Sequence, residues 1–258
     1  MRLIKMLCAD WMKTKRTPIR LIAYITPIVY SICMIMYNKH NKFQIQNYDT
    51  FFNAMAIILP IGIALISALI CEQEENAGNF NGLLSIPASR IKIYISKLII
   101  LILIIIIDII VSTIIMIWGL KFIIHMESID SKVFMQGALF MSLASIAICS
   151  LDLLISFMFG MGASIGIGAM GVLIAAILGA TPVGDSIWMF IPWTYPARWG
   201  LLPGTFINGA YIPVNTNSVE YFNVQLQKGM LSISIFFILI TILGMIWFEK
   251  WEGKKSYD

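Results

Sequence analysis

Charge is scarce in this sequence. Only 12% of its 258 residues are Asp, Glu, Lys or Arg, whereas 59% are hydrophobic. A soluble domain of this length needs more charged surface than these residues can supply. The sequence therefore predicts an all-α membrane protein that crosses the bilayer several times.

Several chemical signatures are also absent. No G-x-x-x-x-G-K-[ST] phosphate-binding loop occurs, which excludes ATP hydrolysis by that route. The motifs H-E-x-x-H and G-x-S-x-G are missing, the two histidines stand alone, and the four cysteines are scattered singly. We therefore expect a chain that is not an enzyme, holds no metal or cofactor, and needs no nucleic acid partner.

Six apolar runs are long enough to cross a bilayer. Five of them cover about residues 19–37, 51–71, 93–118, 133–159 and 229–248, and the remaining one follows Gly160-Met161-Gly162. So short a turn makes spans four and five antiparallel neighbours. In span five, Gly171, Ala175 and Gly179 form a small-residue stripe that favours close helix packing. We treat residues 1–258 as a single transmembrane domain.

The basic residues predict which way the chain is oriented. Residues 1–18 combine Trp11 with several lysines and arginines, which is typical of a helix lying in the headgroup layer. The termini and the loops on their side carry 12 of the 18 Lys and Arg residues, and the opposite side carries 6. We expect both termini to be cytoplasmic and the protein to lie in the cell membrane.

A polar island separates the second and third spans. Its three carboxylates cannot lie in hydrocarbon, so the segment must reach water at a membrane face. Apolar residues follow at helical spacing and give a short amphipathic helix one apolar edge. The residues concerned are Glu72, Glu74, Glu75, Phe80, Leu83 and Leu84. We interpret residues 72–90 as a cytoplasmic coupling loop gripped by a soluble motor, although an ordinary solvated loop would have the same composition.

Residues 182–228 form a long segment that is neither spanning nor hydrophilic. Dense aromatic side chains are typical of the membrane–water boundary, so we expect short re-entrant helices on the external face. The candidate substrate contacts in this segment are Trp188, Trp193, Tyr195, Arg198 and Trp199.

Two acids lie inside spans: Asp108 in span three and Asp152 in span four. A carboxylate in lipid is costly, so each must face the bundle, be protonated or pair. Either acid could belong to a substrate or proton pathway. Each could equally be a buried, hydrogen-bonded group that ties helices together.

The order of parts resembles the permease subunits of type-2 ATP-binding-cassette (ABC) exporters. Residues 72–97, EQEENAGNFNGLLSIPASRIKIYISK, are similar to the coupling region of lantibiotic-immunity permeases, and 191–196, IPWTYP, adds to the likeness. The resemblance implies a partner ATPase homodimer that binds ATP and Mg²⁺, and a second permease that is often different and in some systems identical. It also implies a lantibiotic-like peptide as cargo, and the residues of the polar island as the ATPase-docking helix.

Other functions are compatible with the residues. The same machine could export a peptide made inside the cell, a lipid-linked glycan or a drug. A proton-coupled carrier working through Asp108 and Asp152 is a second class, and a membrane sensor or scaffold is a third.

Overall fold

The structure is a computed structural model that describes residues 3–78, 80, 89–126, 129–207 and 217–251. These residues form helices and turns, with no strand among them. The long helices are α2 (Pro18–Tyr37), α3 (Gln44–Asn76), α5 (Arg90–Phe122), α6 (Ser131–Phe159), α7 (Met161–Ile174) and α9 (Ser218–Lys250). With the π-helical turn Ala175–Gly179 that extends α7, six helices in this part of the chain are long and apolar enough to cross a membrane. The prediction of six spans is confirmed.

Local sequence signals set several helix ends. Pro18 occupies the first turn of α2, where its missing N–H is not needed. Asp130 precedes α6, and its Oδ1 accepts hydrogen bonds from the backbone N–H groups of Lys132 and Val133. Gly160 ends α6 with a φ of 85°, a conformation that favours glycine, and α7 starts at the next residue. The predicted tight turn between spans four and five is confirmed.

Two elements differ from the sequence prediction. Helix α3 continues to Asn76, so Glu72, Glu74 and Glu75 lie in its last turns rather than in a separate loop. Helix α9 begins at Ser218, so residues 218–228 belong to the last span rather than to the aromatic segment. Both helices extend beyond the apolar runs because their polar turns continue the backbone hydrogen bonding past the hydrocarbon.

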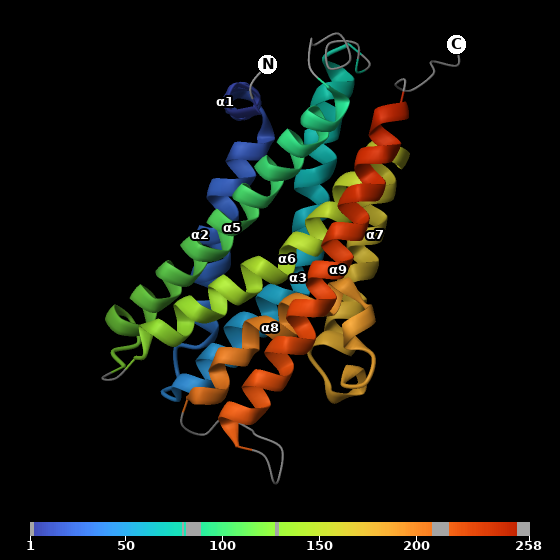
Figure 1. Ribbon diagram of the computed structural model, residues 1–258. Coiled ribbons are helices and arrows are strands. Elements are labelled where there is room, and N and C mark those ends of the chain that lie inside the picture. The colour runs from blue at the N-terminus through green and yellow to red at the C-terminus, as the bar shows by residue number, and fades with distance from the viewer. Residues whose placement is uncertain (1–2, 79, 81–88, 127–128, 208–216, 252–258) are drawn as a thin grey trace.

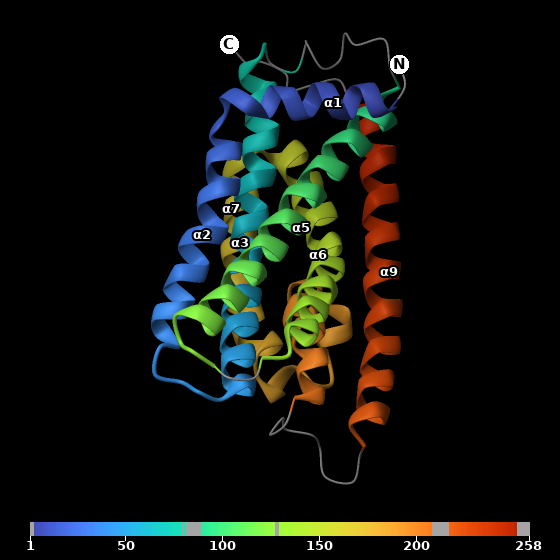
Figure 2. The same cartoon turned by 90° about the vertical axis from the view of Figure 1, so that its left-hand side faces the viewer.

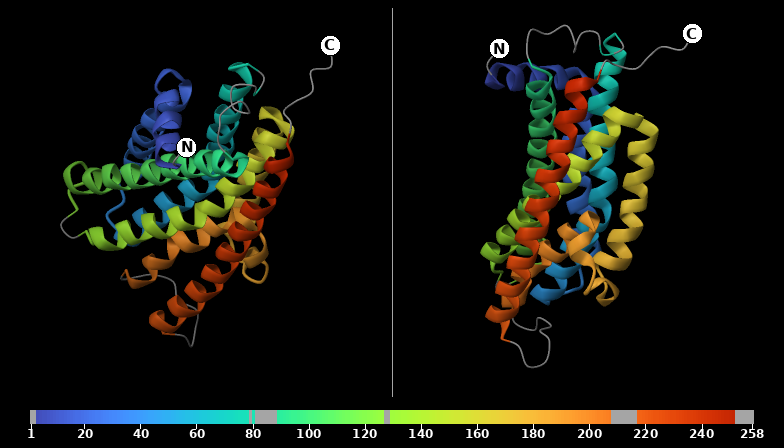
Figure 3. Two further views of the ribbon diagram at one scale, coloured as in Figure 1. Left: turned by 45° about the horizontal axis from the view of Figure 1, so that its top comes forward. Right: turned by 45° about the vertical axis from the view of Figure 1, so that its right-hand side comes forward.

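Helix α6 lies at the centre of the bundle and packs against α3, α5, α7, α8 (Tyr195–Leu201) and α9 (Figures 1 and 3). Helix α2 packs mainly on α5, and α3 packs mainly on α7 and α6. Spans two and three therefore pack mainly on other helices and less on each other, although they are consecutive in sequence.

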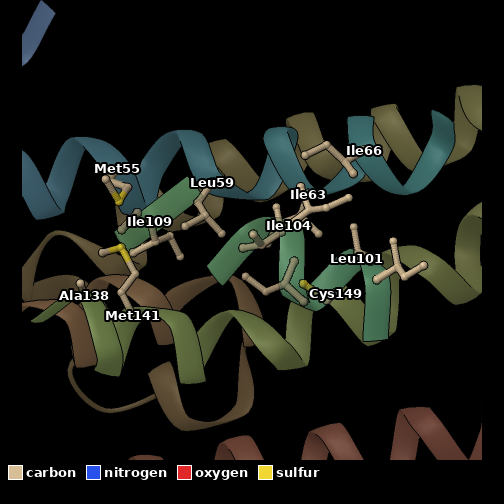
Figure 4. Packing of buried hydrophobic residues seen from close by; sticks show 14 of the residues in the cluster. Met55, Leu59, Ile63, Ile66, Leu101, Ile104, Ile109, Ala138, Met141 and Cys149 are labelled. Atoms are coloured by element: carbon tan, nitrogen blue, oxygen red, sulfur yellow. The ribbon is translucent and has the colours of Figure 1, made fainter. Parts of the chain in front are cut away.

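In the middle of the bundle, the core brings together aliphatic and sulfur-containing side chains of α3, α5 and α6. Leu59 and Ile63 of α3 face Ile104 of α5, with Met141 and Cys149 of α6 on the other side (Figure 4). Figure 4 shows these side chains pointing toward one another between the ribbons. Their packing positions the charged groups at either end.

The small-residue stripe of span five is used inside the chain. A Cβ at Gly171 would lie 2.4 Å from the ring of Trp193, and one at Gly179 would lie 3.1 Å from Ala197. Ala175 is fully buried. These residues let α7 and its extension approach the turns that follow, which explains the stripe without a second protein.

Candidate functional site

The end of α3 carries a buried carboxylate that holds three helices together. Glu74 is only 3% exposed and forms ion pairs with Lys97 of α5 and with Lys13 of α1 (Leu3–Lys13), the latter at 2.9 Å. Lys97 is 4% exposed and also contacts Asp10 of α1, at 2.8 Å. Helix α1 lies across this end of the bundle, over α3 and α5 (Figure 2).

The four groups balance in charge. Two carboxylates face two ammonium groups, and Asp10 accepts a further hydrogen bond from Ser96 Oγ at 2.6 Å. Buried ions lose their hydration, so they are tolerated only when partners and hydrogen bonds replace it. We call Asp10, Lys13, Glu74 and Lys97 the charge cluster.

Phe80, four residues beyond α3, is fully buried and adopts a φ of 65°. Its ring lies 4.8 Å from that of Trp251 and 6.3 Å from that of Phe157 in α6, measured between centroids. Arg90, at the start of α5, donates from Nη1 to the carbonyl oxygens of Glu249 and Trp251. The two ends of the loop between α3 and α5 are thus attached to α6 and to the end of α9.

These contacts change the roles expected of the polar island. Glu74 and Phe80 point into the bundle and are not on a surface that another protein could grip. Glu72 and Glu75 are partly exposed on the last turns of α3. Leu83 and Leu84 lie outside the described residues. The structure therefore brings Glu74 and Phe80 together with α1, α5, α6 and α9 as anchors of the loop.

Of the charge cluster, the sequence predicts a role only for Glu74. Asp10 and Lys13 lie in the basic segment expected to contact the headgroups, and Lys97 lies near the predicted start of span three. One signal was available in the sequence. Lys97 comes after Arg90 and Lys92, at the start of a long apolar run. A lysine in that position needs a buried acid as partner.

At the opposite end, the aromatic segment is folded inward. Trp188, Tyr195 and Trp199 are buried against Ala144 and Ala147 of α6 and Ile233 of α9. The Tyr195 hydroxyl donates to the carbonyl oxygen of Met189 at 2.9 Å, and burial raises its pKa to about 12. Packing against α6 and α9 takes these three side chains off the surface of the chain, so their role as substrate contacts stays a prediction. Trp193 is half-buried.

A polar cavity of about 470 Å³ lies beside this aromatic cluster. Arg198 on its wall pairs with Asp185 and donates from Nη2 to the carbonyl oxygens of Leu178 and Thr181, at 3.0 and 2.7 Å. Asp49, near the start of α3, also lines the cavity and is partly exposed. No described side chain forms an ion pair with Asp49, so it is the carboxylate in this cavity that a cationic ligand would meet.

The two acids inside the spans are not brought together. Asp152 of α6 is fully buried, and neither of its carboxylate oxygens has a hydrogen-bond partner among the described residues. Asp108 of α5 lines a separate apolar cavity next to α2 and α3, and its Oδ1 likewise has no such partner. Within the described residues, no three His, Cys, Asp or Glu side chains gather in a way that could hold a metal ion.

Comparison with protein families gives one match. The family described as ABC-2 family transporter protein matches residues 6–179, which include the charge cluster and the first five spans. Comparison with curated proteins and with solved structures gives no match.

Proposed function

We propose that this chain, which belongs to the ABC-2 transporter family and is a permease subunit of an ABC transporter, expels a lantibiotic-like antimicrobial peptide from the cell membrane. Family membership also means that it works with an ABC ATPase in a lipid bilayer. We further propose that the ATPase is a homodimer that supplies the ATP and Mg²⁺ sites, and that a second permease, different or identical, completes the transporter.

The charge cluster supports the coupling part of the proposal. A motor protein that pushes on the loop between α3 and α5 would act on a segment joined by ion pairs to α1 and by ring contacts to α6 and the end of α9. Because Glu74 and Phe80 are buried, displacing either residue would move the helices that it contacts. The push would reach α6, on which most of the bundle packs.

The polar cavity at the other end is the observation that carries the choice of cargo. The excess of Lys and Arg near the termini favours cytoplasmic termini, which puts this cavity on the external side. Asp49, which forms no ion pair with a described side chain, suits a cationic group, and the lining combines polar side chains with apolar ones such as Trp188 and Trp199. A cationic amphipathic peptide that has entered the outer leaflet would reach this cavity from the membrane.

An inhibition assay tests the cargo. The transporter genes are expressed in a lantibiotic-sensitive Gram-positive strain, and the minimum inhibitory concentration of purified, externally added lantibiotics is measured. We expect protection that disappears when this chain is deleted and falls several-fold with Asp49→Asn. Glu220→Gln is the control, because Glu220 is exposed on the first turn of α9 and does not line the cavity.

If deletion of this chain leaves lantibiotic sensitivity unchanged and stops secretion of a peptide, glycan or drug, the cargo is a molecule from inside the cell. Transport by the purified chain in ATP-free vesicles driven by a pH gradient would replace the proposal with a proton-coupled carrier.

The docking surface has its own test. Glu72→Lys combined with Leu84→Asp should abolish co-purification of the ATPase, because it reverses a partly exposed charge and removes the expected apolar edge. Lys92→Met, a change to an exposed residue at the start of α5, is the control. Co-purification that survives the double change would place the motor elsewhere on the chain.

A further inference from the structure

An apolar cavity of about 350 Å³ opens on the side of the bundle where α2, α3 and α5 meet. It falls within the size range of small-molecule sites, roughly 300–1,000 Å³. Its walls are mostly isoleucine, leucine and methionine side chains, and Ile58, which is 50% exposed, stands at its outer edge. Since Ile58 belongs to the middle of a spanning helix, the cavity opens toward the interior of the membrane rather than toward water.

Asp108 is the charged residue among the described residues that line this cavity. Two other polar groups there are already engaged: Tyr30 donates its hydroxyl hydrogen to the carbonyl oxygen of Phe51 at 2.6 Å, and the carbonyl oxygen of Ser112 accepts a hydrogen bond from Ser31 at 2.9 Å. Asp108 Oδ1 has no hydrogen-bond partner among the described residues. Its carboxylate is therefore available to a ligand.

Among the described residues, no Lys or Arg side chain forms an ion pair with Asp108. Lys97 is on the same helix, but it lies about 16 Å away along the axis, at 1.5 Å per residue. It is also held by Asp10 and Glu74. An ionised carboxylate in a membrane interior is costly unless it is paired, and the described residues around Asp108 supply no pair.

We propose that this cavity binds a lipophilic monocation, whose alkyl or aryl body fills the apolar space and whose ammonium group pairs with Asp108. An apolar body alone would leave the carboxylate unpaired, and an anionic ligand would be repelled by it. A ligand with both features fills the apolar space and also pairs with the carboxylate. The site does not depend on which cargo the transporter moves, and it is separate from the polar cavity at Asp49.

Gly62 allows the cavity to be closed without disturbing the fold. It lines the cavity, and a Cβ added to it meets no atom within 4 Å. Leucine is also a better helix former than glycine. Gly62→Leu should therefore fill the cavity while α3 stays intact. Gly166→Leu is the matched control, because Gly166 is a helical glycine on α7 with equally open surroundings and no part in the cavity.

The experiment uses the full chain in phosphatidylcholine nanodiscs and dodecylamine that carries a diazirine in its chain. After illumination, mass spectrometry compares labelling of α2, α3 and α5 peptides with labelling of lipid-facing α9 peptides. We expect selective labelling around the cavity, competition by dodecyltrimethylammonium, and little competition by dodecanol. Asp108→Asn should weaken competition by at least about tenfold, because the partner of a buried charge is lost. Asp152→Asn should leave it unchanged.

Gly62→Leu should abolish the selective labelling, and Gly166→Leu should preserve it. Labelling that is insensitive to Gly62→Leu, or equal on all lipid-facing helices, would overturn the site. Equal competition by dodecanol and the quaternary amine, or an unchanged Asp108→Asn variant, would overturn the cationic ligand. The Gly62→Leu result decides the matter if Asp108→Asn fails to fold, and neither result depends on protection against lantibiotics.

Discussion

Near the termini, buried ion pairs join the helices beside a group of aromatic rings, whereas among the described residues the opposite end has aromatic rings packed against glycines and no ion pair with both partners buried. At the first end, Glu74 and Lys97 are buried and each has two charged partners. At the second, Trp199 packs on Gly229, and the ion pair of Asp185 with Arg198 is largely at the surface. An ion pair depends on its particular partner side chain, whereas close packing depends on the volumes of the residues in contact. This difference underlies the proposal that force enters at one end and cargo is met at the other.

Among the variants that test this contrast between the two ends, Lys97→Met should have the largest effect on stability. The change leaves two buried carboxylates, Asp10 and Glu74, without their shared partner, and removing one member of a buried ion pair costs about 3–5 kcal/mol. We expect a large fall in the thermal unfolding temperature of the detergent-solubilised protein.

Lys92→Met provides the control for that measurement, since Lys92 is exposed near the same end of α5. The further variant Asp10→Asn, Glu74→Gln, Lys97→Met removes the unpaired buried carboxylates and leaves only the partly exposed Lys13 charged in the cluster, so it should recover part of the loss. Equal stability of Lys97→Met and Lys92→Met would show that the charge cluster does not hold this end.

A middle-sized effect is expected at the aromatic end from Gly229→Val. A Cβ at Gly229 would lie 1.7 Å from Nε1 of Trp199, so the valine must displace the indole or the whole of α9. Overpacking of this kind costs about 1–3 kcal/mol. The readout is the unfolding temperature together with tryptophan fluorescence. Gly166→Val, at an open position, should change neither, and an unaffected Gly229→Val would mean that α9 does not pack closely on α8.

The smallest effect is expected from Asp185→Asn. The Asp185 side chain is 64% exposed, and exposed ion pairs contribute about 0.2–1 kcal/mol. We expect a shift in unfolding temperature close to experimental error, and smaller still at high salt because exposed pairs are screened. A loss as large as that of Lys97→Met would erase the contrast between the two ends.

Much of the fold could be predicted because the bilayer imposes simple rules. Span number, the turn at Gly160 and the small-residue packing of span five follow from hydropathy and from residue size. The helix ends were less predictable, since α3 and α9 continue as helices through polar residues such as Glu72 and Glu220. Hydropathy marks where hydrocarbon ends, not where backbone hydrogen bonding ends.

The candidate sites were harder to predict, because each depends on residues far apart in sequence. The acidic cluster at the end of span two was noticed, but Glu74 meets Lys13 and Lys97, which are 61 and 23 residues away. Aromatic density correctly identified an unusual segment, yet burial of Trp188 and Tyr195 against α6 depends on the path of the chain. Asp108 stood out from its apolar surroundings, whereas the cavity beside it did not.

The sequence by itself determined that this protein crosses a membrane six times, because each apolar run is long enough to span hydrocarbon and too apolar to remain in water. It also determined that charged residues would gather at the helix ends. Only the tertiary structure decided which of those charges are paired inside the bundle and which acids are left for a ligand. Pairing depends on the few ångströms between side chains of neighbouring helices, and helix packing sets those distances.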